Sequence, residues 1–149
     1  KYNIDNIQSD SIDLITAWHS IEHIHNIDNL FLDIHRILKH DKYFFICVPN
    51  SNAIEQKFYK ENWVAWDAPR HLYHFTPKLL KKYVEKFDFK VVYCESMLQD
   101  TAYNILLSIK NKNIYNILKA FLIMCYSYLL NIVSGYNKSS SFILICKKY

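Results

Sequence analysis

Residues 11–26, with the sequence SIDLITAWHSIEHIHN, decide the fold of this chain. The first half is a short apolar run that predicts a buried strand from Ile12 to Trp18, and the second half places isoleucines at helical spacing. A strand is therefore expected to pass into a helix near His19, with Glu22 and His23 at the start of that helix. In open α/β sheets ligands bind at the carboxyl ends of the strands, so this junction is a predicted ligand site.

The next segments extend this stretch into a strand, helix, strand unit. Asp28 or Asn29 is expected to cap a helix that ends near Lys39, because apolar residues recur there at spacings of three and four. Residues 40–42 (HDK) are predicted to form a tight turn. The apolar run from Tyr43 to Val48 is typical of a central parallel strand covered on both faces. Such a unit predicts a right-handed crossover.

The rest of the chain predicts a loop, helices and two more strands. Residues 51–76 form a long loop rich in aromatic residues, and loops of this length usually carry function or are ordered by packing. Thr76 and Pro77 are expected to start the next helix. Strands are predicted from Phe89 to Ser96 and from Ser141 to Lys147. Between them lies a predicted helical insertion over about residues 101–137.

Composition limits the class of protein. The 149 residues are enough for one domain with its own core, and 51% of them are apolar. The net charge of +4 is mild and the lysines are dispersed, which argues against a nucleic-acid partner. The only glycine is Gly135, so the chain has no glycine-rich phosphate loop. A nucleotide-like cofactor would need its main cradle elsewhere.

The cysteines and the first residues suggest a compartment. The four cysteines are far apart within apolar runs, a pattern expected for buried thiols in a reducing compartment. The sequence begins at Lys1 with neither a signal peptide nor an initiator methionine, which predicts a cytoplasmic protein and a piece of a longer one.

Three stretches together resemble a known family. Residues 11–26 resemble the fourth strand and following helix of the class I S-adenosylmethionine-dependent methyltransferases. HRILKHDKYFFICVPN (35–50) is similar to their R-x-L-K-P-x-G turn and fifth strand, although His40 and Lys42 replace the usual proline and glycine. WDAPRHLYHFTPKLLKKYVEKFDFKVV (66–92) is similar to the following loop, helix and sixth strand. The resemblance is to the C-terminal half, in particular of the bacterial group related to ubiquinone-biosynthesis and lipopolysaccharide-cluster enzymes.

The resemblance implies a fold and an activity. The expected fold is α/β and Rossmann-like, with a mostly parallel sheet, an antiparallel last strand and the helical insertion. Residues 1–149 would then be a single partial methyltransferase domain that lacks the half carrying the cofactor loop. The expected reaction is methyl transfer from S-adenosylmethionine to a small-molecule or lipid-linked acceptor, and the chain is not expected to be active alone.

The resemblance also implies roles for particular residues. The residues after the fourth strand should contact the cofactor, and the aromatic loop should face the acceptor. An imidazole suits the removal of a proton from an acceptor hydroxyl. The cofactor-binding residues are thus Ala17, Trp18 and His19, the substrate-binding residues are Trp63, Trp66, Arg70 and His74, and the catalytic base is His71.

A different interpretation comes from the residues themselves. His19, Glu22 and His23 spell H-x-x-E-H, and two histidines four positions apart on one helical face can share a metal ion. The resemblance adds to this, because some ubiquinone-type methyltransferases are similar here and hold a divalent cation. The alternative prediction is therefore a non-catalytic or divalent-metal-binding remnant that uses these three residues.

The insertion raises the question of a membrane. Residues 120–137 carry no charge, but polar residues such as Tyr126 and Ser127 interrupt them, which argues against a membrane-spanning helix. With lysines before it, a helix over about 113–133 is expected either to lie in a membrane interface or to pack on the domain. The protein is accordingly predicted to be cytoplasmic, with peripheral contact at the inner membrane as the second expectation.

Overall fold

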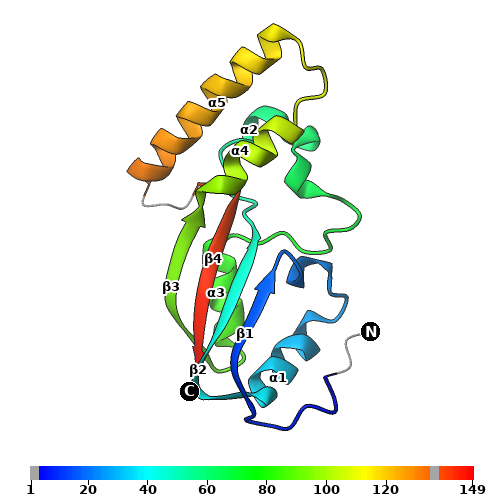
Figure 1. Cartoon of the computed structure of the whole chain (residues 1–149), viewed down its shortest axis with the longest axis vertical. Helices are drawn as coiled ribbons and strands as arrows, with labels where there is room; N and C mark the ends of the chain where they lie inside the picture. Colours follow the sequence, from blue (N-terminus) through cyan, green and yellow to red (C-terminus); the bar gives the residue numbers. More distant parts are fainter. Residues whose placement is uncertain (1–3, 135–137) are drawn as a thin grey trace.

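The computed structural model describes residues 4–134 and 138–149. One sheet forms its centre, with α1 and α3 beside the sheet and α4 and α5 beyond one end of it (Figure 1). The strands are β1 (Ile12–Trp18), β2 (Leu38–Pro49), β3 (Phe89–Met97) and β4 (Ser141–Lys148). The helices are α1 (Ile27–Ile37), α2 (Gln56–Tyr59), α3 (Pro77–Glu85), α4 (Leu98–Leu107) and α5 (Ile114–Val133), with 3-10 turns η1 (Ile21–His23), η2 (Lys60–Asn62) and η3 (Val64–Trp66).

The sheet is mixed, and the prediction of a mostly parallel sheet is wrong. The strand order is β1-β2-β4-β3. Among the strands of the described sheet, β1 and β2 alone pair in parallel, whereas β4 pairs antiparallel with both β2 and β3. The reason is the position of β4: the last strand of the chain lies between two strands that run opposite to it, so it takes part in two of the three pairings. The prediction that this last strand is antiparallel is confirmed.

The strand, helix, strand unit is present, with shifted boundaries. Asn26 caps α1 by accepting a hydrogen bond from the backbone N–H of Asn29, so the predicted caps are off by two or three residues. The predicted turn at 40–42 is wrong, because β2 already begins at Leu38. Ile12 of β1 pairs with Leu38 of β2, and Leu14 pairs with Tyr43. The residues of β2 between Leu38 and Tyr43 therefore form an irregularity in the strand.

The main core lies between the sheet and the two helices α1 and α3. Phe31 of α1 is fully buried and contacts the rings of Phe44 in β2 and Phe89 in β3. Thr76 caps α3 through the N–H of Leu79, as the sequence predicts for a Thr-Pro helix start. This packing fixes the carboxyl ends of β1 and β2, where the candidate site lies.

The insertion consists of two helices. Helix α4 ends at Leu107 and α5 begins at Ile114, where Asn113 caps it. Helix α5 is long and apolar enough to cross a membrane by length and composition. The part of the predicted insertion at 135–137 lies outside the described residues.

Candidate functional site

A cleft of about 380 Å³ opens at the carboxyl ends of β1 and β2. His19 follows β1 and Pro49 ends β2, so both contribute to its floor. Its walls are the loop that carries η3 and the face of α4 that runs from Asp100 to Leu107. The lining residues are His19, Pro49, Val64, Ala65, Asp67, Arg70, His71, Asp100, Tyr103, Asn104, Leu107 and Ser141.

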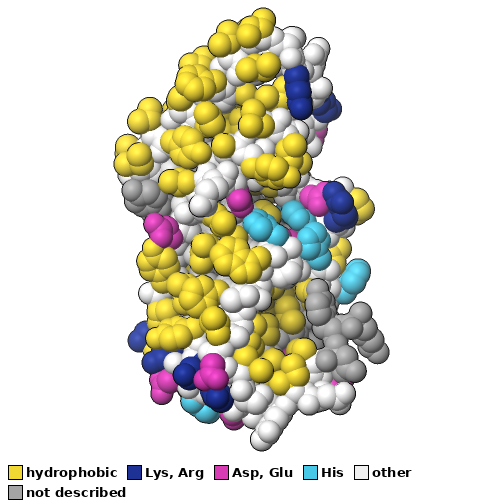
Figure 2. All heavy atoms as spheres, in the orientation of Figure 1, with side chains coloured by type: hydrophobic (Ala, Val, Ile, Leu, Met, Phe, Trp, Pro, Cys, Tyr) yellow, Lys and Arg dark blue, Asp and Glu magenta, His cyan; other side chains and the backbone are white. Residues whose placement is uncertain are grey.

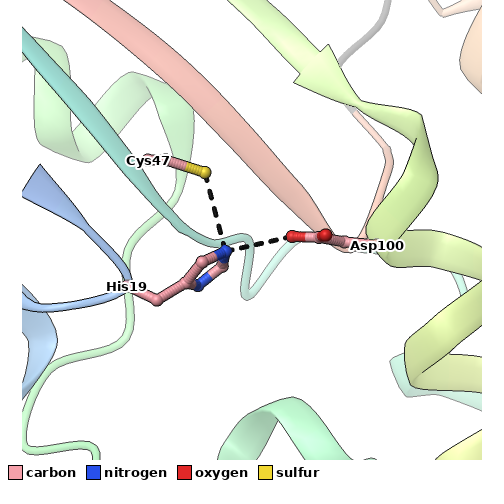
Figure 3. A group of neighbouring side chains, drawn as sticks. All are labelled: His19, Cys47 and Asp100. Atoms are coloured by element: carbon pink, nitrogen blue, oxygen red, sulfur yellow. Dashed lines mark hydrogen bonds and ion pairs between the residues drawn. The ribbon is translucent and has the colours of Figure 1, made fainter.

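His19 occupies the centre of a polar cluster. Its backbone adopts a positive φ of 43°, while its N–H donates to the carbonyl of Cys47 at 2.9 Å, so the chain turns sharply at the end of β1. The imidazole Nε2 lies 3.1 Å from the Asp100 carboxylate and 3.6 Å from the Cys47 thiol (Figure 3). Its Nδ1 lies 3.6 Å from a carboxylate oxygen of Glu22.

These neighbours hold His19 in its charged form. The hydrogen bond to Asp100, with smaller contributions from Cys47 and Glu22, raises the pKa of His19 to about 12. Burial acts to raise the pKa of Asp100, but its hydrogen bonds with His19 and Ser141 outweigh burial and lower that pKa. The pair is therefore an imidazolium and a carboxylate at neutral pH. No sequence pattern linked these two residues, because 81 positions separate them.

Glu22 is a fully buried acid without a hydrogen bond from the described residues. Neither of its carboxylate oxygens has a hydrogen-bond partner. The nearest basic atoms are Nδ1 of His19 at 3.6 Å and Nε2 of His71 at 3.9 Å. Both distances are beyond hydrogen-bond range, and burying a carboxylate without hydrogen bonds is costly, so this arrangement suggests a ligand contact. The predicted helix at Glu22 and His23 is wrong: both residues lie in the single turn η1.

His23 and His71 have defined ring orientations. Nδ1 of His71 lies 3.0 Å from the carbonyl of Ala65, and Nδ1 of His23 lies 2.9 Å from the carbonyl of Arg70. A carbonyl can only accept, so each Nδ1 donates, and in the neutral ring Nε2 is left as an acceptor. The ring centroids are 4.7 Å apart. One potential ligand atom from each of Glu22, His23 and His71 lies within 4.8 Å of the other two.

Two of the predicted metal ligands lie beside a histidine that the metal prediction did not include. Glu22 and His23 group with His71, whereas His19 groups with Cys47 and Asp100. His71 comes from the aromatic loop, 49 positions beyond Glu22, and the backbone N–H of Leu72 donates to the carbonyl of Glu22 at 2.8 Å. This loop contact brings the third histidine to the turn.

The predicted substrate residues are divided by the structure. Arg70 lines the cleft, where its guanidinium pairs with Asp67 at 2.6 Å. Trp63 is only 2% exposed and packs beneath the loop against Trp66. His74 packs on the edge of Trp66 at 4.9 Å, and burial together with the neighbouring His71 lowers the pKa of His74. These last three residues support the loop and are not among those lining the cleft.

The predicted cofactor residues lie on two sides of β1. His19 lines the cleft, whereas Ala17 lines a separate apolar groove between β1 and α1. Trp18 is 49% exposed at the end of β1, which is an edge strand of the described sheet. His19 is thus the one member of this predicted set that shares a cleft with His71 and Arg70.

Three of the solved structures with the same fold are described as methyltransferases. One is a SAM-dependent methyltransferase from Archaeoglobus fulgidus, with 19% identity and a TM-score of 0.57 over 97% of this chain and 63% of that one. Another is a possible histamine N-methyltransferase from Thermotoga maritima, with 14% identity and a TM-score of 0.61 over 97% and 59%. A third is phosphoethanolamine N-methyltransferase 2 from Haemonchus contortus with S-adenosyl-L-methionine, with 18% identity and a TM-score of 0.56 over 96% and 34%. The chain spans about three fifths of the length of the first two.

The fold is therefore the Rossmann-like fold of class I methyltransferases. A sequence profile described as "Methyltransferase domain" matches residues 3–93, and no curated protein matches the chain significantly. The chain belongs to the S-adenosylmethionine-dependent methyltransferase domain family. This confirms the family predicted from the sequence.

Proposed function

We propose that this chain forms the acceptor side of an S-adenosylmethionine-dependent methyltransferase that acts on a small-molecule or lipid-linked acceptor. We assign it to the bacterial group of ubiquinone-biosynthesis and lipopolysaccharide-cluster enzymes, and to the cytoplasm. The observation that carries this proposal is the His71 imidazole. Its Nε2 is an acceptor within the cleft, and its Nδ1 donates to the carbonyl of Ala65.

His71 is the general base in this proposal. A base must reach the proton that it removes, and His71 lines the same cleft as Arg70 and His19. Its side chain is only 10% exposed, and Glu22 lies 3.9 Å from Nε2, so an imidazolium formed by proton transfer has a carboxylate beside it. Arg70 at the rim attracts an anionic group of the acceptor.

The residues around His19 fit the cationic end of the cofactor. Two carboxyl groups, those of Glu22 and Asp100, lie within 3.6 Å of the single His19 imidazolium, so the acidic groups outnumber the cation and the cluster favours a further positively charged ligand group. The sulfonium centre of S-adenosylmethionine carries such a positive charge, and it would supply the electrophilic methyl group. His19, with Ala17 and Trp18 beside it, would position the methionine end, and Trp63, Trp66 and His74 would hold the loop that covers the acceptor.

Two substitutions in the complete enzyme test this assignment. His71→Ala should lower turnover about 100-fold and leave the Kd of S-adenosylmethionine unchanged, which is the usual effect of losing a general base. His19→Ala should instead weaken cofactor binding. His40→Ala is the matched control, because His40 is exposed near the start of β2, lies outside the cleft lining, and should change turnover little when it is lost. Intact turnover with a lower Tm in His71→Ala would show that His71 has a structural role and refute the assignment.

A second candidate function is divalent-metal binding by Glu22, His23 and His71. Metal-ligating histidines usually donate their other ring N–H to a carbonyl or carboxylate, as His23 and His71 do here. Two histidines and a glutamate are a ligand set used for zinc, with a further position open to water or substrate. The buried Glu22 without a hydrogen bond fits such a set.

Metal titration separates the two candidates. If the metal site exists, calorimetry should detect zinc binding that is lost in His23→Ala, and chelator should abolish activity that added zinc restores. His23→Ala is informative because the first candidate gives His23 no role. Activity that is insensitive to chelator, together with no zinc binding, would refute the metal site. The first candidate, methyl transfer by positioning with His71 as the base, would then remain.

A further inference from the structure

Helix α5 has an outer face that is apolar and an inner face that contains polar residues. Its buried residues are Ser127 and Asn131, together with Ala120 and Ile123, which form a small core with Ile105 and Ile109. Apolar side chains gather over α5 in the space-filling view (Figure 2). The large side chains that α5 exposes are Ile114, Tyr115, Ile117, Leu118, Phe121, Leu122, Tyr126, Leu129, Ile132 and Val133. A helix that packs on a protein core and faces water has a polar outer face, whereas the outer face of α5 is mostly apolar.

Polar contacts fix this orientation. The side-chain oxygen of Asn131 accepts hydrogen bonds from the Ser96 hydroxyl and from the backbone N–H of Lys138, both at 3.0 Å. The Tyr128 hydroxyl donates to the carbonyl of Leu98 at 3.2 Å. A rotation of α5 that buried its apolar face would break these bonds. The outward apolar face is therefore a built feature of the fold.

The face is large and continuous. At 100° per residue the exposed apolar side chains cover about half of the helix circumference, over a helix about 30 Å long. Exposed apolar surface of this size marks an interaction site. A partner helix would need only a narrow stripe, whereas a half-cylinder of aliphatic and aromatic side chains suits a surface that surrounds the helix.

Charge indicates which surface that is. The sequence contains no Asp or Glu after Asp100, but it contains six lysines there. Three of them, Lys110, Lys112 and Lys119, lie before α5 or near its start. Lysines beside an apolar helical face bind the anionic headgroups of a bilayer while the apolar side chains enter the acyl boundary.

We propose that α5 lies in the interface of an anionic lipid bilayer, with its outer face in the lipid and its inner face on the domain. The helix passes the length and composition criteria for a membrane span. Its inner face is nevertheless bonded to Ser96 and Leu98 near the end of the sheet, so α5 stays beside the domain and parallel to the membrane surface.

The neighbouring helix α4 carries apolar side chains to the cleft. Helix α4 contacts α5 and exposes Tyr103, Leu106 and Leu107, and both Tyr103 and Leu107 also line the cleft at His19 and His71. Use of these side chains by a lipid-linked acceptor rests on the proposed function, whereas lipid binding by α5 does not.

Flotation of the full chain with vesicles tests the proposal. The protein should float with phosphatidylcholine vesicles that contain phosphatidylglycerol and much less with phosphatidylcholine alone. The double substitution Phe121→Asp and Leu122→Asp should lower partitioning at least about 100-fold, since burial of each side chain is worth more than about tenfold. Replacing the three lysines by glutamine should lower binding by about fivefold per lysine on anionic vesicles. This second variant leaves the apolar face and the helix intact.

The control is Leu32→Asp, which makes the same change at an exposed leucine of α1 and should leave flotation unchanged. Far-UV circular dichroism should show the same helix content in all variants. Alkaline carbonate should release the bound protein, and resistance to it would refute the interfacial placement in favour of a span. Lipid binding by α5 would be refuted if the wild-type protein did not float, or if the double variant floated to the same extent as the wild type. An oligomer that the double variant converts to a monomer, without flotation of either, would show that a second copy covers the face.

Discussion

The Asp100→Asn substitution offers a direct test of the charged pair in the cleft. The variant keeps the size of the side chain but removes the charge that lies 3.1 Å from Nε2 of His19. For unit charges at this distance, Coulomb attraction is about 1 kcal/mol with the screening of water and about 5 kcal/mol at an effective dielectric constant of about 20. Because the side chain of His19 is 41% exposed, we take the lower part of this range, about 1–2 kcal/mol.

The pH dependence has a defined sign. Because the pKa of Asp100 is lowered, its contribution to stability is present above its unfolded value of 3.8 and is lost as the pH falls through the folded value. Because the pKa of His19 is raised, its contribution is full below the unfolded value of 6.5 and declines as the pH rises towards about 12. The difference in unfolding free energy between wild type and Asp100→Asn should therefore be largest between about pH 4 and 6.5.

Urea unfolding at pH 5.5 and at pH 2.5 measures this difference. We expect about 1–2 kcal/mol at the higher pH and a smaller difference at the lower, because the contribution of Asp100 is lost as the pH falls below 3.8 and through its lowered folded pKa. Asp33→Asn is the matched control, since Asp33 of α1 pairs with Arg36 on the surface and its loss should cost less than about 1 kcal/mol. An equal loss at both pH values would show that Asp100 acts through packing and would refute the charged pair.

Three further substitutions test the core, a helix cap and the buried acid. Phe31→Ala should lower the free energy of unfolding by about 3–5 kcal/mol, because the ring is fully buried against Phe44; urea unfolding measures it, and a loss below about 1 kcal/mol would contradict this packing. Thr76→Ala should cost about 1 kcal/mol by removing the cap on Leu79, and Thr76→Ser should restore most of it. Glu22→Gln should lower the Tm, because it removes a buried carboxylate that lies 3.6 Å from the His19 imidazolium; an unchanged or higher Tm by calorimetry would show that this ion pair does not outweigh the cost of burying the carboxylate.

Local patterns predicted most of the secondary structure and part of the site. Strand β1 has the predicted limits, and the Thr-Pro start of α3 is capped as expected. Both depend on contacts within a few residues, which sequence spacing reports directly. The turn predicted at 40–42 is instead an irregularity within β2: Asp41 has a positive φ of 62°, and the pairing with β1 passes from Leu38 directly to Tyr43.

The sequence by itself determined the family, the strand and helix types, and the stretch at which the cleft forms. Only the tertiary structure decided that β4 lies between β2 and β3, that Asp100 and Cys47 meet His19, and that His71 joins Glu22 and His23. It also decided that α5 faces outward with its apolar side chains. The physical reason is that spacing along a helix or strand sets the direction of each side chain, so periodicity shows which residues share a face. The element that covers a face is chosen by strand pairing and by contacts between residues as far apart as His19 and Asp100, which no local spacing encodes.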